Sequence, residues 1–102
     1  MTPNEIIQVL ERSEGQRIRL QDGYGRTFKA VPAITQEEGY KNGYRVVTVL
    51  LDVESSGDIP RNSNPVVVAV RPPESKWVVN VHYFSSEMPE TQLMEWVEPV
   101  EH

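Results

Sequence analysis

The chain lacks cysteine and long apolar runs, and each absence excludes a class of protein. Its 102 residues contain no cysteine, so a disulfide scaffold, a thiol nucleophile and a thiolate metal site are excluded. The longest apolar stretches, Val46–Leu51 and Pro65–Val70, fall well short of the roughly 20 residues that a membrane helix needs. The N-terminus has neither the basic start nor the apolar run of a secretory signal. We therefore expect a soluble cytoplasmic protein with no membrane association.

Basic residues are also scarce, and they are unevenly placed. Ten Lys and Arg stand against fifteen Asp and Glu, which leaves a formal charge of −5. Residues 1–45 carry a net +1 and residues 46–102 a net −6. This pattern fits an ordinary solvated surface, and it equally fits a bipolar molecule that docks onto itself or a partner.

The length fits a single domain spanning residues 1–102. A chain of this size buries roughly two-thirds of its unfolded surface, so one modest core is enough without cross-links. No repeat, low-complexity segment or linker interrupts it.

The first segment predicts a helix over residues 3–13. Thr2 can cap the N-terminus, Pro3 suits the first helical position, and Glu5 completes a capping box. Apolar residues then recur at helical spacing, and Gly15 is typical of a helix end.

Residues 16–31 alternate between apolar and polar side chains and predict a β-hairpin. A five-residue loop pairs Leu20 with Phe28 and Ile18 with Ala30, which keeps the apolar side chains on one face. A two-residue loop would mix the faces. The outer face then carries Arg17, Arg19, Thr27 and Lys29.

The middle of the chain is predicted mainly from its prolines and apolar runs. Pro32 should end the hairpin strand, because proline has no N–H to donate. Residues 35–38 could form one helical turn, although the glycines that follow indicate a loop. The nearly continuous apolar run over 44–53 is typical of a central strand covered on both faces, and residues 54–64 predict a long loop.

Two further strands, Pro65–Arg71 and Trp77–Phe84, flank a proline-containing loop. Pairing them across that loop aligns Val67 with Val81. The opposite face carries Val66, Val68, Val70 and Val78, beside Asn80 and His82. Both faces of the pair are therefore apolar. One packs in the core, and the other must meet the N-terminal helix, more sheet or a partner.

The tail fits two patterns. Leu93, Trp96 and Val97 have helical spacing, whereas Leu93, Glu95 and Val97 alternate as a strand would. We expect a helical turn over 89–94 followed by a short final strand.

A short helix, then Gly15–Gly23, then a strand around Phe28 occupy the first third of the chain. This order resembles the beginning of Sm-like and related SH3-like small barrels, and Trp77–Val81 followed by Leu93–Val97 resembles the end of SH3-like barrels. The Sm-type RNA-binding signature, an Arg-Gly or Lys-Gly dipeptide after a late strand, is missing. The resemblance therefore implies a fold and no function. We expect a mostly β (α+β) protein: an N-terminal helix followed by a five- to six-stranded bent antiparallel sheet or a small SH3/Sm-like barrel.

Few residues offer catalytic chemistry. His82, near Ser85, would need an acid such as Asp52 or Asp58 to form a triad, and no Gly-x-Ser-x-Gly turn supports one. Asp52, Glu54 and Asp58 could hold a hard cation, but their spacing does not match the calcium-loop pattern. We expect no catalytic residue, no metal and no cofactor.

These exclusions favour a non-catalytic, small acidic interaction module or accessory subunit. It would bind a protein partner or form a homo-oligomer through an apolar sheet face and an aromatic rim. The candidate contacts are Val66, Val68, Val70, Tyr40, Tyr44 and Trp96.

Two alternatives stay open. The first is a weak single-stranded nucleic-acid binder that uses the basic hairpin 16–31, since cations contact phosphates and aromatic rings stack on bases. Its candidate residues are Arg17, Arg19, Tyr24, Arg26 and Lys29. The overall acidity opposes this alternative, because such domains are usually basic. The second is a small inhibitor or immunity-type protein, which the acidic composition allows.

Overall fold

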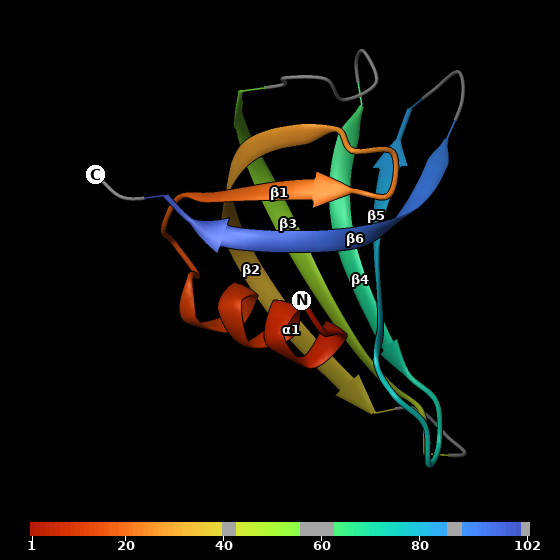
Figure 1. The fold of residues 1–102 in the computed structure, drawn as a ribbon. Coiled ribbons are helices and arrows are strands. Elements are labelled where there is room, and N and C mark those ends of the chain that lie inside the picture. Colours follow the sequence, from red (N-terminus) through yellow and green to blue (C-terminus); the bar gives the residue numbers. More distant parts are fainter. Residues whose placement is uncertain (40–42, 56–62, 86–88, 101–102) are drawn as a thin grey trace.

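In the described part of the chain, one N-terminal helix and six strands form a closed antiparallel barrel (Figure 1). The computed structural model describes residues 1–39, 43–55, 63–85 and 89–100, with the backbone alone at 34–38 and 55. Neighbouring strands pair in chain order, and β6 pairs with β1 to close the barrel. This architecture is the α+β small barrel that the sequence predicts. The elements are α1 (Pro3–Arg12), β1 (Ile18–Asp22), β2 (Thr27–Gly39), β3 (Arg45–Ser55), β4 (Asn64–Arg71), β5 (Val78–Phe84) and β6 (Glu90–Pro99).

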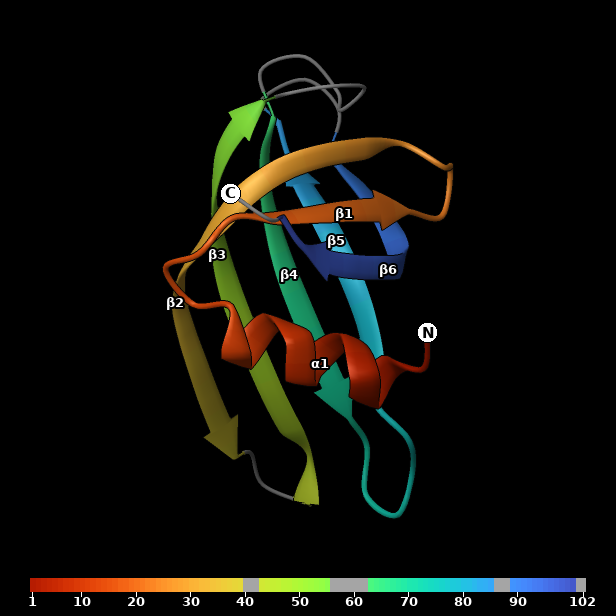
Figure 2. The ribbon, with the colours of Figure 1, turned by 60° about the vertical axis from the view of Figure 1, so that its left-hand side comes forward.

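Helix α1 begins at the predicted capping box. Thr2 Oγ1 accepts the N–H of Glu5 at 3.2 Å, and Glu5 Oε1 accepts the N–H of Thr2 at 3.1 Å. The backbone bond to Thr2 lowers the pKa of the Glu5 carboxyl. Ile6, Ile7 and Leu10 are buried and belong to the same apolar core as residues from all six strands. The helix lies across the inner side of the sheet (Figure 2), so it fills the mouth of the barrel.

The hairpin register is confirmed. Ile18 pairs with Ala30 and Leu20 pairs with Phe28, and all four side chains are buried. The basic side chains of β1 and β2 consequently share the outer face.

The register of the later strands is also confirmed, since Val67 of β4 lies opposite Val81 of β5. On the other side of β4, Val67 pairs with Val49 of β3. The expectation that the central strand is covered on both faces is wrong for the described residues. Helix α1 packs on the inner face, and Leu50 on the outer face is 42% exposed.

Strand β2 does not end at Pro32, as the sequence predicts, but runs on to Gly39. The pairing register with β3 shifts between Pro32 and Ile34. A proline without an N–H is tolerated at such an irregularity. The loop expected over 35–38 is therefore wrong, and so is the alternative of one helical turn, because β3 supplies a pairing partner that the local pattern does not reveal.

Strand β6 is continuous over Glu90–Pro99, so the helical turn expected over 89–94 is wrong. Its first part pairs with β5 and its second part with β1. Both of those strands have backbone groups that need partners at this position. Strand pairing therefore outweighs the helical spacing of the apolar side chains.

Candidate functional site

The outer side of β3 to β6 carries a continuous surface without Lys, Arg, Asp or Glu, which we call the uncharged face. Three cross-strand rows form it. The first row is Leu50, Val66, His82 and Thr91. The second row is Thr48, Val68, Asn80 and Leu93. The third row is Val46, Val70 and Val78, and Phe84 lies beyond the first row.

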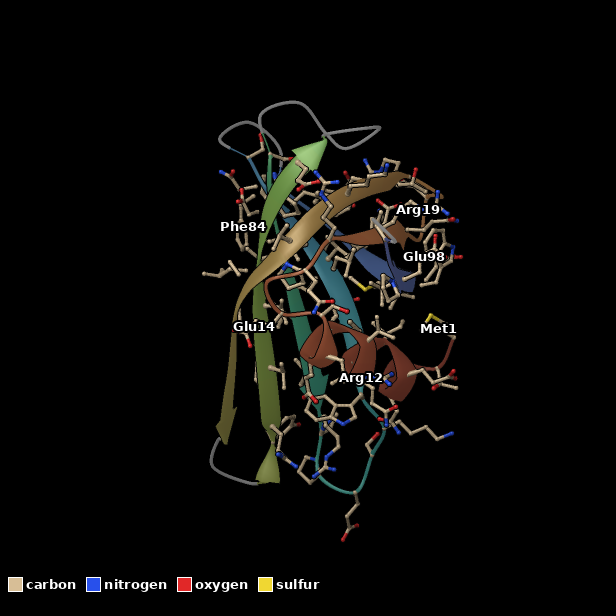
Figure 3. The ribbon with its side chains drawn as sticks, turned by 90° about the vertical axis from the view of Figure 1, so that its left-hand side faces the viewer. Met1, Arg12, Glu14, Arg19, Phe84 and Glu98 are labelled. Carbon is tan, nitrogen blue, oxygen red and sulfur yellow. The ribbon has the colours of Figure 1, made fainter. Side chains whose placement is uncertain are left out.

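Large apolar side chains on the uncharged face are open to solvent. Leu93 is 59% exposed, Phe84 54%, Val78 43% and Leu50 42%. Figure 3 shows Phe84 on the side of the molecule away from Arg12 of α1. The predicted contacts Val66, Val68 and Val70 are each half-buried among these side chains. Their outward halves add nothing to the core, so the uncharged face is available for contact with another molecule.

His82, the histidine of the uncharged face, contacts two neighbours on that face. His82 Nδ1 lies 2.8 Å from Thr91 Oγ1, and the His82 ring stacks on Phe84 with centroids 6.1 Å apart. These contacts involve a hydroxyl and an aromatic ring, whereas a triad histidine needs a carboxylate to orient it. Asp58, one of the two acids considered for that role, lies outside the described residues.

Of the other predicted partner contacts, Tyr44 lies next to the uncharged face, two residues before Val46, and Trp96 lies apart from it. Tyr44 stands just before β3 and is 43% exposed, and Tyr40 lies outside the described residues. Trp96 lies on the part of β6 that pairs with β1, opposite Gln21. The guanidinium of Arg19 stands 5.3 Å from the Trp96 ring centroid. The apolar rows and Trp96 are therefore separate features of the surface.

The basic hairpin face is largely neutralised by carboxylates. Arg17 Nε lies 2.8 Å from Glu54 Oε1, and Arg19 Nη2 lies 2.5 Å from Glu98 Oε1 (Figure 3). Arg26 is also ion-paired, with its side chain only 19% exposed. The remaining members, Lys29 and Tyr24, are exposed. A phosphate would have to compete with these carboxylates for three of the four predicted cations.

A buried carboxylate organises the turn between β1 and β2. Asp22, 0% exposed, accepts the N–H groups of Tyr24 and Arg26 at Oδ1, at 2.9 and 3.0 Å. Its Oδ2 accepts Arg26 Nε and the Tyr83 hydroxyl, each at 2.8 Å. Arg26 Nη2 also lies 3.0 Å from Glu90 Oε1. With two donors on each oxygen, Asp22 is fully used in holding the hairpin to β5 and β6.

The sequence reasoning missed this network. Asp22 followed by Gly23 is a known turn signal, because an Asp side chain bonds to the N–H two residues on. That signal could have revealed the local half of the network. No local pattern points to Tyr83, which is 61 residues away.

Tyr83 gives the network a testable pH dependence. Burial, reinforced by the hydrogen bond to the Asp22 carboxylate, raises the pKa of the Tyr83 hydroxyl. As the pH rises, the unfolded chain therefore loses the Tyr83 proton before the folded chain does. The protonated hydroxyl contributes its full stability below about pH 10, and this contribution is lost as the pH rises further. We expect Tyr83→Phe to leave the phenolate absorbance of the folded protein unchanged between about pH 9 and 11. A loss of one ionising tyrosine in that range would contradict this account.

Among the side chains described, no three His, Asp or Glu lie close enough to share a metal ion. Over the described residues, no helix is long and apolar enough to cross a membrane. No protein-family model matches the sequence, and no curated protein or solved structure shows significant similarity to it.

Proposed function

We propose that this protein is a non-catalytic interaction module that binds a protein partner through the uncharged face. One observation carries the proposal: twelve adjacent outward positions hold no charged side chain, although a quarter of the sequence is charged. The largest apolar patch on a typical monomer covers about 300–600 Å² and is often the site of a functional contact.

The absence of charged side chains on the uncharged face favours a protein partner over nucleic acid. Nucleic acid is disfavoured, because phosphate binding needs cations and the face has none. Of the cations on the basic hairpin, Arg17 and Arg19 are already paired with Glu54 and Glu98. A protein surface with its own apolar side chains matches the face, and an inhibitor or immunity-type role would be one form of such binding.

Site-specific photocrosslinking tests this function. A benzophenone-bearing amino acid at Phe84 is a conservative replacement on the uncharged face, and the same residue at Tyr24 is a matched control. Tyr24 is 71% exposed at the hairpin tip, and Phe84 is 54% exposed. After irradiation in the native cells, we expect covalent protein adducts at position 84 and few at position 24. Adducts that are absent at 84, or equal at both positions, would rule out this face as the contact site.

A further inference from the structure

We infer that the occupant of the uncharged face is a second copy of this chain, related to the first by a twofold axis. This inference rests on the proposed function and identifies its partner. The axis would lie between the two packed sheets and run across the strands along the second row, the one that contains Val68 and Asn80. Each residue of that row then faces its own copy, as an isologous interface requires.

The charge distribution favours a second copy. Each chain has a formal charge of −5, so two copies repel wherever their carboxylates come within about 10 Å of each other. The uncharged face is a surface on which they can meet without that juxtaposition. A partner selected by charge would find nothing on this face to recognise. Self-association needs only apolar contact and matched polar groups.

The rows match one another under this axis. The second row faces itself, so Val68 packs on Val68 of the other copy. The first row of one copy faces the third row of the other, which places Val66 opposite Val70 and Leu50 opposite Val46. Apolar side chains therefore meet apolar side chains at half of the twelve positions, and His82 of one copy lies opposite Val78 of the other. Two sheets packed face to face in this way resemble the layers of a β-sandwich.

The ends of the face are also complementary. Beyond the first row, β3 carries the exposed carboxylate of Asp52. Beyond the third row, the turn from β4 to β5 exposes both Glu74 and Lys76, and Arg45 and Arg71 lie at the adjoining strand ends, so cations outnumber carboxylates among the described residues there. An axis across the strands brings the end with Asp52 in one copy to the end with Lys76 in the other. Opposite charges then meet at the rim, where they help to set orientation.

Asn80 provides the most specific argument. It is half-buried near the middle of the second row, where a covering partner would remove its amide from water. An amide carries both a donor and an acceptor, so it can pair with an identical amide across a twofold axis. An unmatched partner would leave these groups without hydrogen bonds, which is costly. A second copy of the chain brings its own Asn80 amide to this position.

The size of the face predicts a reversible dimer. Each outward position of a sheet occupies about 30 Å² of its plane, so the twelve positions cover roughly 400 Å². This area is below the roughly 800 Å² per partner of standard interfaces, so the contact should be weak. We therefore expect a dissociation constant on the order of micromolar.

Sedimentation velocity on the full chain, from about 1 to about 500 µM, tests the inference. We expect a concentration-dependent shift from monomer to dimer. Asn80→Asp should raise the dissociation constant at least about a hundredfold, because it places two carboxylates against each other in a dry interface. Gln8→Glu is the matched control, since it makes the same chemical change at an exposed position of α1 and should leave dimerisation nearly unchanged.

The outcomes separate this inference from the proposed function. A wild-type protein that stays monomeric over the whole range overturns the dimer, as does equal weakening by Asn80→Asp and Gln8→Glu. If a monomeric chain still crosslinks to a different protein through position 84, the interaction function stands and only the identity of the partner fails. Should Asn80→Asp fail to fold, Val68→Cys offers a second test in a chain that has no natural cysteine. A short bismaleimide should couple its copies faster than those of Tyr24→Cys, and equal rates would contradict the twofold arrangement.

Discussion

Replacing Asp22 with alanine should lower the free energy of unfolding by about 3–5 kcal/mol. The carboxylate is 0% exposed and accepts four hydrogen bonds, including those from Arg26 Nε and the Tyr83 hydroxyl. Without it, the side chain of Arg26, 19% exposed, keeps the ion pair with Glu90 and its contacts with the rings of Tyr24 and Tyr83. A buried charge and a buried hydroxyl would both lose their main partner. Equilibrium unfolding in urea measures the change.

Two control variants test whether the loss of stability comes from the hydrogen bonds of Asp22. Tyr83→Phe removes one donor and leaves the Asp22–Arg26 pair in place, so it should cost about 1–2 kcal/mol. Asp52→Ala removes an exposed carboxylate from β3 and should change stability by no more than about 0.5 kcal/mol. If Asp22→Ala proves as mild as Asp52→Ala, the network does not hold the β1–β2 turn to β5.

Leu10→Ala should destabilise the protein by about 2–5 kcal/mol, because it leaves a cavity between α1 and the inner side of the barrel. Leu10 is 2% exposed and belongs to the core that includes residues from every strand. The same substitution at Leu93, 59% exposed on β6, removes little buried area and should cost less than about 1 kcal/mol. Urea unfolding of both variants, followed by tryptophan fluorescence at a protein concentration about a hundredfold below the expected dissociation constant, keeps dimer formation from contributing. Similar losses for the two variants would show that α1 is not packed into the barrel mouth.

Local patterns in the sequence determined the start of the helix and two hairpin registers. The Thr2–Glu5 capping box formed as predicted, because its groups are three residues apart and need no tertiary partner. The pairing of Leu20 with Phe28 and of Val67 with Val81 followed from strict alternation about a short loop. A shift of the pairing by one residue would turn every apolar side chain outward. The shifted pairings are therefore much less stable than the observed ones.

Only part of the uncharged face could be predicted from the sequence, because its residues come from strands that are far apart in the chain. Alternation along β4 placed Val66, Val68 and Val70 on one face. It did not show that Leu50 and Leu93, from strands on either side, extend the same face. That information resides in the order of strands around the barrel, which requires pairing between residues far apart in the chain.

Tertiary structure alone decided the remaining features. Residues 89–94 have spacing compatible with a helix, yet they became strand because β5 and β1 both required a partner there. Pro32 did not end β2, because a shift of register against β3 absorbed its missing donor. The bond between Asp22 and Tyr83 exists only once the barrel has closed. In each case the deciding energy comes from satisfying backbone or buried polar groups across long sequence separations, whereas the elements predicted correctly depend on neighbours within a few residues.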